Sequence, residues 1–260
     1  MKLKMIALAA MLAAGSANAG IVDGSTGNGE LFMTVLDNAG QKSYTLDLNL
    51  TMNDFLSGIA VTGTKYSYAA DANMTSFLSG VAGADRSSLI FAIGAMDNIG
   101  ATTTDTYRYI SSASVIDLGT RLTNLNLKQL GTNGDQFLGD TNGSIGSANS
   151  LIVTDPSAVA YAGSALWGSN WGNKANFTST GLIGGDLGMY YLTQTSGTFG
   201  DRLKPSSYAA LMNGGNQVFA NLDMNGNLMV AAVPEAETYA MMLAGLGLVG
   251  FMVARRRKAI

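Results

Sequence analysis

Histidine and cysteine are both absent from this sequence of 260 residues. Without histidine, the chain cannot build a Ser-His-Asp or Cys-His nucleophile, a histidine general base or the usual zinc and copper sites. Without cysteine, it cannot form the disulfides that are common in exported proteins. Its stability must therefore come from burial in a sheet, from bound ions or from partners.

Basic side chains and glutamate are scarce between residues 20 and 233. This segment carries sixteen acidic and nine basic side chains, a net charge of −7, and Glu30 is its only glutamate. Its closest basic pairing is Arg202 with Lys204. Nucleic acids and anionic lipids require clustered lysine and arginine, so this composition predicts that neither is a partner of the segment.

The N-terminal residues have the pattern of a signal peptide. Two lysines precede an apolar stretch from Met5 to Ala14, and a run of small residues then ends in Ala17-Asn-Ala19. The apolar stretch is well short of the ~20 residues that span a bilayer. The pattern predicts a signal peptide over residues 1–19, exported by the Sec machinery and cut by signal peptidase after Ala19, with Gly20 as the mature N-terminus.

The C-terminal residues 234–260 combine three signals in order. The pair Pro234-Glu235 is followed by an apolar segment over about 240–254 and then by Arg255, Arg256, Arg257 and Lys258. Fifteen helical residues cover roughly 23 Å, against a hydrocarbon core of ~30 Å, so the segment predicts a marginal single transmembrane helix. Basic residues stay on the cytoplasmic side, which places the C-terminus inside and the preceding domain outside.

This tail resembles the PEP-CTERM sorting signal of Gram-negative bacteria that make exopolysaccharide. The resemblance rests on Val233-Pro-Glu-Ala-Glu-Thr-Tyr-Ala240, the apolar segment and the closing Arg-Arg-Arg-Lys. It implies recognition by a membrane-embedded exosortase-like enzyme, which cuts near Pro234 and Glu235 and releases or transfers the protein. Ala236 stands where the family has its second proline, and this departure leaves a plain, uncut membrane anchor as an alternative.

Between the two ends, the pattern predicts one mainly β domain over residues 20–233. Side chains alternate between apolar and polar from Ser43 to Leu50, as in a half-buried strand, and turn residues separate many other short β-prone runs. This favours a β-sandwich or barrel-like fold with a few short helices. The expected hairpins pair Leu31–Leu36 with Lys42–Leu48 and Gln217–Leu222 with Asn227–Ala231; other strands are Ser88–Ala95, Thr106–Ser112, Leu151–Thr154 and Met189–Thr195, and helices are Met52–Ala60, Met74–Val81 and Pro156–Trp167.

The stretch Gly131–Ser150 is rich in Gly, Asn, Thr, Asp and Ser and is predicted to be a loop or a pair of tight turns, whereas Arg121–Leu130 fits a helix or a strand. Two short motifs alternate carboxylate and amide oxygens like the first half of a calcium loop: Asp140 with Asn142, and Asp223 with Asn225. Neither has the closing acidic residue, and ordinary Asx-turns, the favoured interpretation, explain both. We therefore assign no metal or cofactor.

Aromatic side chains offer one further candidate. Trp167 and Trp171, with Tyr161 nearby, lie in a Gly- and Asn-rich region where indole faces could stack on sugar rings. Burial in the core is the alternative.

No catalytic residue is assigned, because most aspartates lie beside turn-forming residues, where backbone chemistry alone explains them. The predicted function is that of a non-enzymatic cell-surface or extracellular-matrix protein, structural or adhesive. The matrix role and the association with exopolysaccharide, as in a biofilm, are what the family resemblance implies. The alternative is a polysaccharide-active enzyme, which would need two aspartates about 5–9 Å apart in a cleft.

Overall fold

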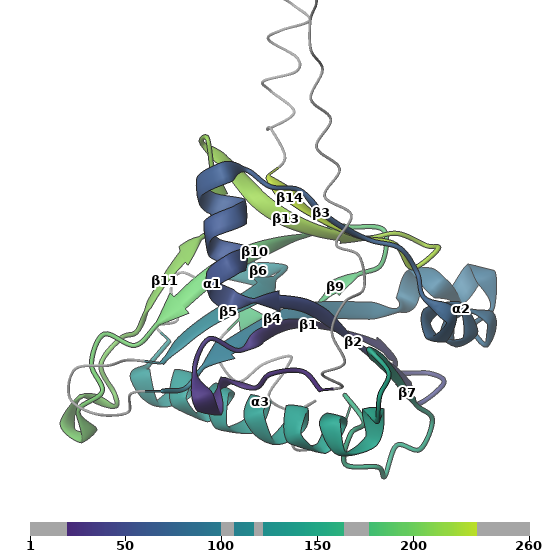
Figure 1. The fold of residues 1–260 in the computed structure, drawn as a ribbon, viewed down its shortest axis with the longest axis horizontal. Helices are drawn as coiled ribbons and strands as arrows, with labels where there is room; N and C mark the ends of the chain where they lie inside the picture. The colour runs from purple at the N-terminus through teal and green to yellow at the C-terminus, as the bar shows by residue number, and fades with distance from the viewer. Residues whose placement is uncertain (1–19, 100–106, 117–121, 164–176, 233–260) are drawn as a thin grey trace, which may run out of the picture.

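A computed structural model of the protein describes residues 20–99, 107–116, 122–163 and 177–232 (Figure 1). Strands form most of the regular structure, which confirms the predicted mainly β class. Within these ranges no helix is both long and apolar enough to span a membrane. The predicted membrane helix over 240–254 lies outside them.

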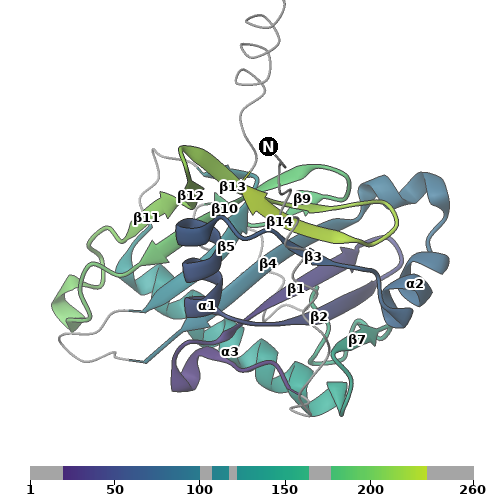
Figure 2. The same cartoon turned by 45° about the horizontal axis from the view of Figure 1, so that its top comes forward.

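One large antiparallel sheet organises the fold, and it curls strongly (Figures 1 and 2). Its strands follow the order β3 (Tyr66–Tyr68), β14 (Leu228–Ala232), β13 (Asn216–Leu222), β10 (Asp186–Thr193), β5 (Arg108–Ala113), β4 (Ile90–Asp97), β1 (Glu30–Asp37), β2 (Lys42–Thr51) and β7 (Ser150–Val153). Three short strands branch from this path: β11 (Ser207–Ala210), β12 (Met212–Asn213) and β9 (Gly181–Leu182). A two-stranded ladder joins β6 (Val115–Ile116) to β8 (Phe177–Thr178). Apart from this ladder, the described strands belong to one continuous curled sheet.

Both predicted hairpins are confirmed. In the first, β1 pairs with β2 so that Val35 lies opposite Tyr44, and in the second, β13 pairs with β14 so that Leu222 lies opposite Leu228. An aspartate closes each turn: Asp37 Oδ1 accepts a hydrogen bond from the Gly40 N–H at 2.8 Å, and Asp223 Oδ1 accepts one from the Asn225 N–H at 2.8 Å. Strong local turn chemistry fixes the register of both pairs.

Two of the three predicted helices are also confirmed. The first is α1 (Met52–Leu56), which continues as the π-helical turn η2 (Ser57–Thr62), and the second is α2 (Ala72–Ser79). Asp71 caps α2, because its Oδ1 accepts a hydrogen bond from the Met74 N–H at 2.6 Å. Short 3₁₀ turns are η1 (Gly24–Thr26), η3 (Gly83–Ser88) and η4 (Phe199–Asp201).

The third predicted helix, Pro156–Trp167, is wrong over its described part, residues 156–163, which forms successive turns. Asp155 does not cap a helix; its Oδ1 accepts hydrogen bonds from the N–H and hydroxyl of Ser157, two residues on. Further on, the Ala162 N–H donates to Ser43 Oγ on β2 at 3.1 Å. Only the end of this segment, Ala160, Tyr161 and Ala162, is buried, and it is held by contacts with the core rather than by helical hydrogen bonds.

The prediction of a loop or a pair of tight turns over Gly131–Ser150 is also wrong, because most of this stretch belongs to the 22-residue helix α3 (Asn124–Ile145). From Asn124 onward, the same helix resolves the open assignment of residues 121–130. Thr123 and Asn126 form a reciprocal capping box that starts the helix. Its small side chains allow close packing on the sheet, with Gly131, Gly134 and Thr141 buried beside Phe137 and Leu138.

The sheet has a hydrophobic core on each face. On one face, α1 and α2 pack Phe55 and Phe77 with strand residues such as Met33. On the other, α3 packs Phe137 onto Phe32, the neighbour of Met33 on β1. Because successive strand residues point to opposite faces, β1 serves both cores.

Candidate functional site

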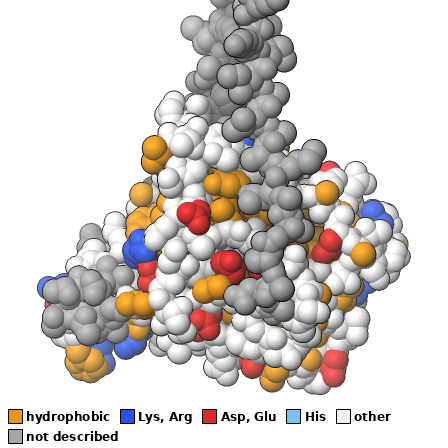
Figure 3. Space-filling view, in the orientation of Figure 1, with side chains coloured by type: hydrophobic (Ala, Val, Ile, Leu, Met, Phe, Trp, Pro, Cys, Tyr) orange, Lys and Arg blue, Asp and Glu red, His pale blue; other side chains and the backbone are white. Residues whose placement is uncertain are grey.

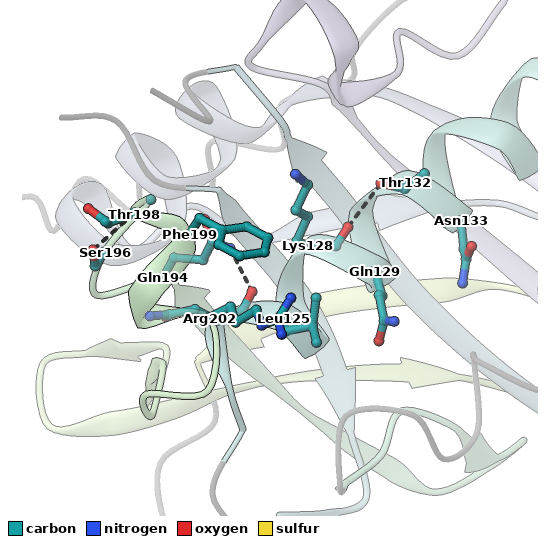
Figure 4. A pocket seen from close by; sticks show the side chains of 12 residues that line it. Leu125, Lys128, Gln129, Thr132, Asn133, Gln194, Ser196, Thr198, Phe199 and Arg202 are labelled. Atoms are coloured by element: carbon teal, nitrogen blue, oxygen red, sulfur yellow. Dashed lines mark hydrogen bonds between the residues drawn. The ribbon is translucent and has the colours of Figure 1, made fainter. Parts of the chain in front are cut away.

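A groove lies between the N-terminal half of α3 and the loop that joins β10 to β11 (Figure 4). Its volume is about 810 Å³, within the range of small-ligand sites. The helix contributes Leu125, Lys128, Gln129, Thr132 and Asn133, and the loop contributes Ser196, Thr198, Phe199 and Arg202.

The loop is fixed to the start of α3 by hydrogen bonds that helix N-termini need. The Asn124 N–H donates to the Lys204 carbonyl at 3.0 Å, and the Leu125 N–H donates to the Arg202 carbonyl at 2.8 Å. First-turn N–H groups have no partner within their own helix, so the loop supplies acceptors to a helix end that would otherwise lack them. Both walls of the groove are thereby held together.

The side chain of Asn124 completes this clamp. Its Oδ1 accepts a hydrogen bond from the Thr195 N–H at 3.0 Å, and its Nδ2 donates to the Asp201 carbonyl at 3.1 Å. Gln194, also buried, donates through Nε2 to the Asn124 carbonyl at 2.6 Å. Asn124 is 1% exposed, so these polar contacts lie away from water and add rigidity.

The groove presents an aromatic ring and two cations. The Phe199 ring is 78% exposed, and the Arg202 guanidinium lies 4.5 Å from its centroid. In Figure 4 the ring extends from the loop toward Lys128 on the helix. No described lining residue carries a carboxylate, and nearby Asp201 is paired with Lys204 at 2.8 Å. The groove therefore carries a local positive charge, although the domain as a whole is acidic.

The space-filling view agrees with this distribution. Figure 3 shows cationic and hydrophobic side chains together at the lower left, where the β10–β11 loop lies, and acidic side chains scattered singly elsewhere on that face. The sequence pattern signalled this place only through the pairing of Arg202 with Lys204. It gave no sign that Lys128 and Phe199 belong to the same site.

The first pair of calcium candidates lies on α3 and not in a loop. The Asn142 side chain makes two hydrogen bonds with the backbone of Ile21. Its Oδ1 accepts from the Ile21 N–H at 2.8 Å, and its Nδ2 donates to the Ile21 carbonyl at 2.9 Å. Asp140 lies two positions earlier on the same helix. A helix cannot wrap alternating oxygens around one cation as a calcium loop does, so the predicted loop geometry is wrong here.

The second pair lies in the β13–β14 turn. Asp223 Oδ1 accepts hydrogen bonds from the N–H groups of Asn225 at 2.8 Å and Asn227 at 2.9 Å, and Oδ2 accepts from Asn227 Nδ2 at 2.8 Å. Partial burial opposes ionisation, but these hydrogen bonds outweigh it and lower the pKa of Asp223. This is the Asx-turn alternative. In the described part of the chain, no three acidic side chains gather as a metal site would require.

The other predicted site residues lie mostly outside the described ranges: Ala17, Ala19, Trp167, Trp171, Pro234, Glu235, Arg255, Arg256, Arg257 and Lys258. Tyr161 is buried in the core beside α3. Gly20 begins the described domain, and the contacts of Ile21 with Asn142 follow at once.

A comparison with protein-family models matches residues 232–258 to the PEP-CTERM protein-sorting motif. The C-terminal tail is a PEP-CTERM sorting motif. This confirms the predicted tail and marks the chain as an exported protein that an exosortase-like enzyme sorts. No curated protein and no solved structure matches the chain.

The PEP-CTERM motif begins where the sheet ends. Its first residue, Ala232, is the last residue of β14 and pairs with Val218 on β13. The predicted cut near Pro234 would therefore leave every residue of β14 with the domain.

Proposed function

We propose that this protein is a non-enzymatic component of the cell surface or extracellular matrix, structural or adhesive, that associates with exopolysaccharide. The observation that carries the proposal is the PEP-CTERM motif joined directly to a folded β domain. The precursor is held in the inner membrane by residues 240–254, with Arg255–Lys258 on the cytoplasmic side. An exosortase-like enzyme then cuts near Pro234 and releases the domain.

The placement of the aspartates supports a non-enzymatic role. Asp71 caps α2, Asp155 and Asp223 close turns, and Asp135 accepts a hydrogen bond from the Gly24 N–H at 2.8 Å. Each of these carboxylates has a structural partner. A glycosidase needs two carboxylates facing the same sugar, and the described lining of the groove provides none.

Intact mass spectrometry tests this function. The native protein would be recovered from the membrane and extracellular fractions of its host, beside the double variant Pro234→Ala, Glu235→Ala. We expect the extracellular species to begin at Gly20 and to end near Pro234, while the variant keeps its C-terminus and stays in the membrane.

Glu237→Ala serves as the matched control, because it removes a tail carboxylate outside the Pro234-Glu235 pair. It should be processed like the native chain. If the native protein instead keeps Arg255–Lys258 and remains in the membrane, the tail is a plain anchor and the matrix role loses its support.

A further inference from the structure

We propose that the groove between α3 and the β10–β11 loop binds an acidic saccharide, a chain whose sugar units carry carboxylates. The biological setting of this ligand rests on the proposed function, whereas its chemistry is inferred from the groove itself. Three properties of the groove lead to this ligand: its charge, its mixed aromatic and amide surface, and its rigidity.

The charge of the groove selects an anion. Lys128 approaches from the helix and Arg202 from the loop, so a ligand between the walls meets a cation on each side. The domain as a whole carries a net charge of −7, which disfavours non-specific binding of polyanions elsewhere on its surface. An arginine guanidinium matches a carboxylate with two parallel hydrogen bonds, and a lysine adds a point charge.

The remaining surface suits sugar rings. An exposed phenyl face such as that of Phe199 packs against the C–H groups on one side of a pyranose, and its large exposed area has no partner within the described chain other than Arg202. Gln129 and Asn133 lie one helical turn apart and offer amide donors and acceptors to hydroxyl groups. From Leu125 to Asn133 the helix rises about 12 Å, which accommodates more than one sugar unit.

The clamp at Asn124 makes the site rigid before a ligand arrives. Because the loop is bonded to the first turn of α3 through both backbone and the Asn124 side chain, the backbone that carries Phe199 and Arg202 needs little further ordering on binding. A preorganised site loses less conformational entropy when it binds, and this favours the modest contacts that sugars make.

Isothermal titration calorimetry with the full chain in a non-ionic detergent tests the proposal. The probes are tetragalacturonate, an acidic tetrasaccharide, and maltotetraose, a neutral one with the same number of rings. We expect tetragalacturonate to bind at least tenfold more tightly than maltotetraose, and its affinity to fall as salt rises.

Variants then locate the binding. Lys128→Ala and Arg202→Ala should each weaken tetragalacturonate binding by about fivefold or more, and Phe199→Ala should weaken binding of both probes. Arg202→Lys should recover part of the loss, because it restores the charge but not the planar fork. Lys65→Ala is the charge-matched control, since Lys65 is exposed and directly precedes β3, a strand that Figure 1 shows on the opposite side of the molecule from α3.

Circular dichroism of each variant establishes that it remains folded. Equal affinity for the two probes, no binding by the native chain, or unchanged affinity in the Lys128→Ala, Arg202→Ala double variant would overturn the proposal. None of these results alters the processing measured by intact mass, so failure of this inference and failure of the proposed function are distinguishable.

Discussion

Among single residues, Asp47 on β2 shows how burial opposes ionisation. The residue is 4% exposed, and its Oδ1 accepts a hydrogen bond from the Asn49 N–H at 2.7 Å. Burial raises its pKa to about 6, the Asn49 hydrogen bond opposes the shift, and the charge of Glu30 adds to it. The folded protein therefore holds this proton more tightly than the unfolded chain does.

This difference in proton affinity makes the stability of the fold depend on pH. Since the unfolded carboxyl has a pKa near 3.9, the Asp47 contribution destabilises the fold increasingly as pH rises from ~4 through ~6. We expect Asp47→Asn to raise the free energy of unfolding at pH 7.5 by on the order of 2 kcal/mol, with little gain at pH 4. An asparagine Oδ1 can still accept the Asn49 hydrogen bond.

Urea unfolding at the two pH values measures this difference. The control is Asp85→Asn, an exposed carboxylate on η3, which should change stability by less than ~0.5 kcal/mol at either pH. An Asp47→Asn variant that is less stable than the native chain at pH 7.5 would contradict the expectation.

At the scale of elements, α3 depends on contacts with distant parts of the chain. A Cβ atom at Gly131 would overlap the Tyr109 hydroxyl and the Asn98 amide, whereas one at Gly139, on the same helix, would meet open space. We expect Gly131→Ala to lower the free energy of unfolding by about 1–3 kcal/mol through overpacking. Gly139→Ala should instead raise it by roughly 0.5–1 kcal/mol, because alanine favours the helix.

Thermal unfolding of the two variants checks this pair, since the substitution is the same and only the surroundings differ. Adding Tyr109→Phe to Gly131→Ala should restore part of the lost stability by removing the overlapping hydroxyl. Equal effects at both positions would show that helix propensity alone decides the outcome.

The same contacts explain which elements the sequence could predict. The hairpins and α2 carry local signals, namely alternation, turn residues and the cap Asp71, so short-range patterns suffice. In α3, Gly131 and Asn142 are residue types that are common in loops. Gly131 instead allows close packing against Tyr109, and Asn142 makes hydrogen bonds with the backbone of Ile21. Those partners are far away in sequence, and a local pattern cannot reveal them.

At the scale of the whole molecule, the groove also depends on contacts between residues that are far apart in sequence. Asn124 and Thr195 are 71 residues apart in sequence, yet their contacts fix the two walls. The sorting tail, by contrast, is a linear sequence motif, so its residues were predictable from sequence alone. Asp223, which the sequence pattern offered as a calcium ligand, required the structure to show that its carboxylate binds the backbone N–H groups of Asn225 and Asn227.

The shared sheet also predicts how the molecule unfolds. Phe55 and Phe137 are both fully buried, but they lie in cores on opposite faces of the sheet. Because β1 contributes to both cores, loss of either should unfold the whole domain in one cooperative transition.

We therefore expect Phe55→Ala and Phe137→Ala each to lower the free energy of unfolding by about 3–5 kcal/mol without separating the transition into two. Phe199→Ala is the control, because that ring is 78% exposed and its removal should change stability by less than ~0.5 kcal/mol. Far-ultraviolet and near-ultraviolet circular dichroism during urea unfolding should give coincident transitions for all three variants. If Phe137→Ala instead released α3 in an earlier, separate step, the helix would be an independent layer, and the groove that it forms with the β10–β11 loop could open without unfolding the sheet.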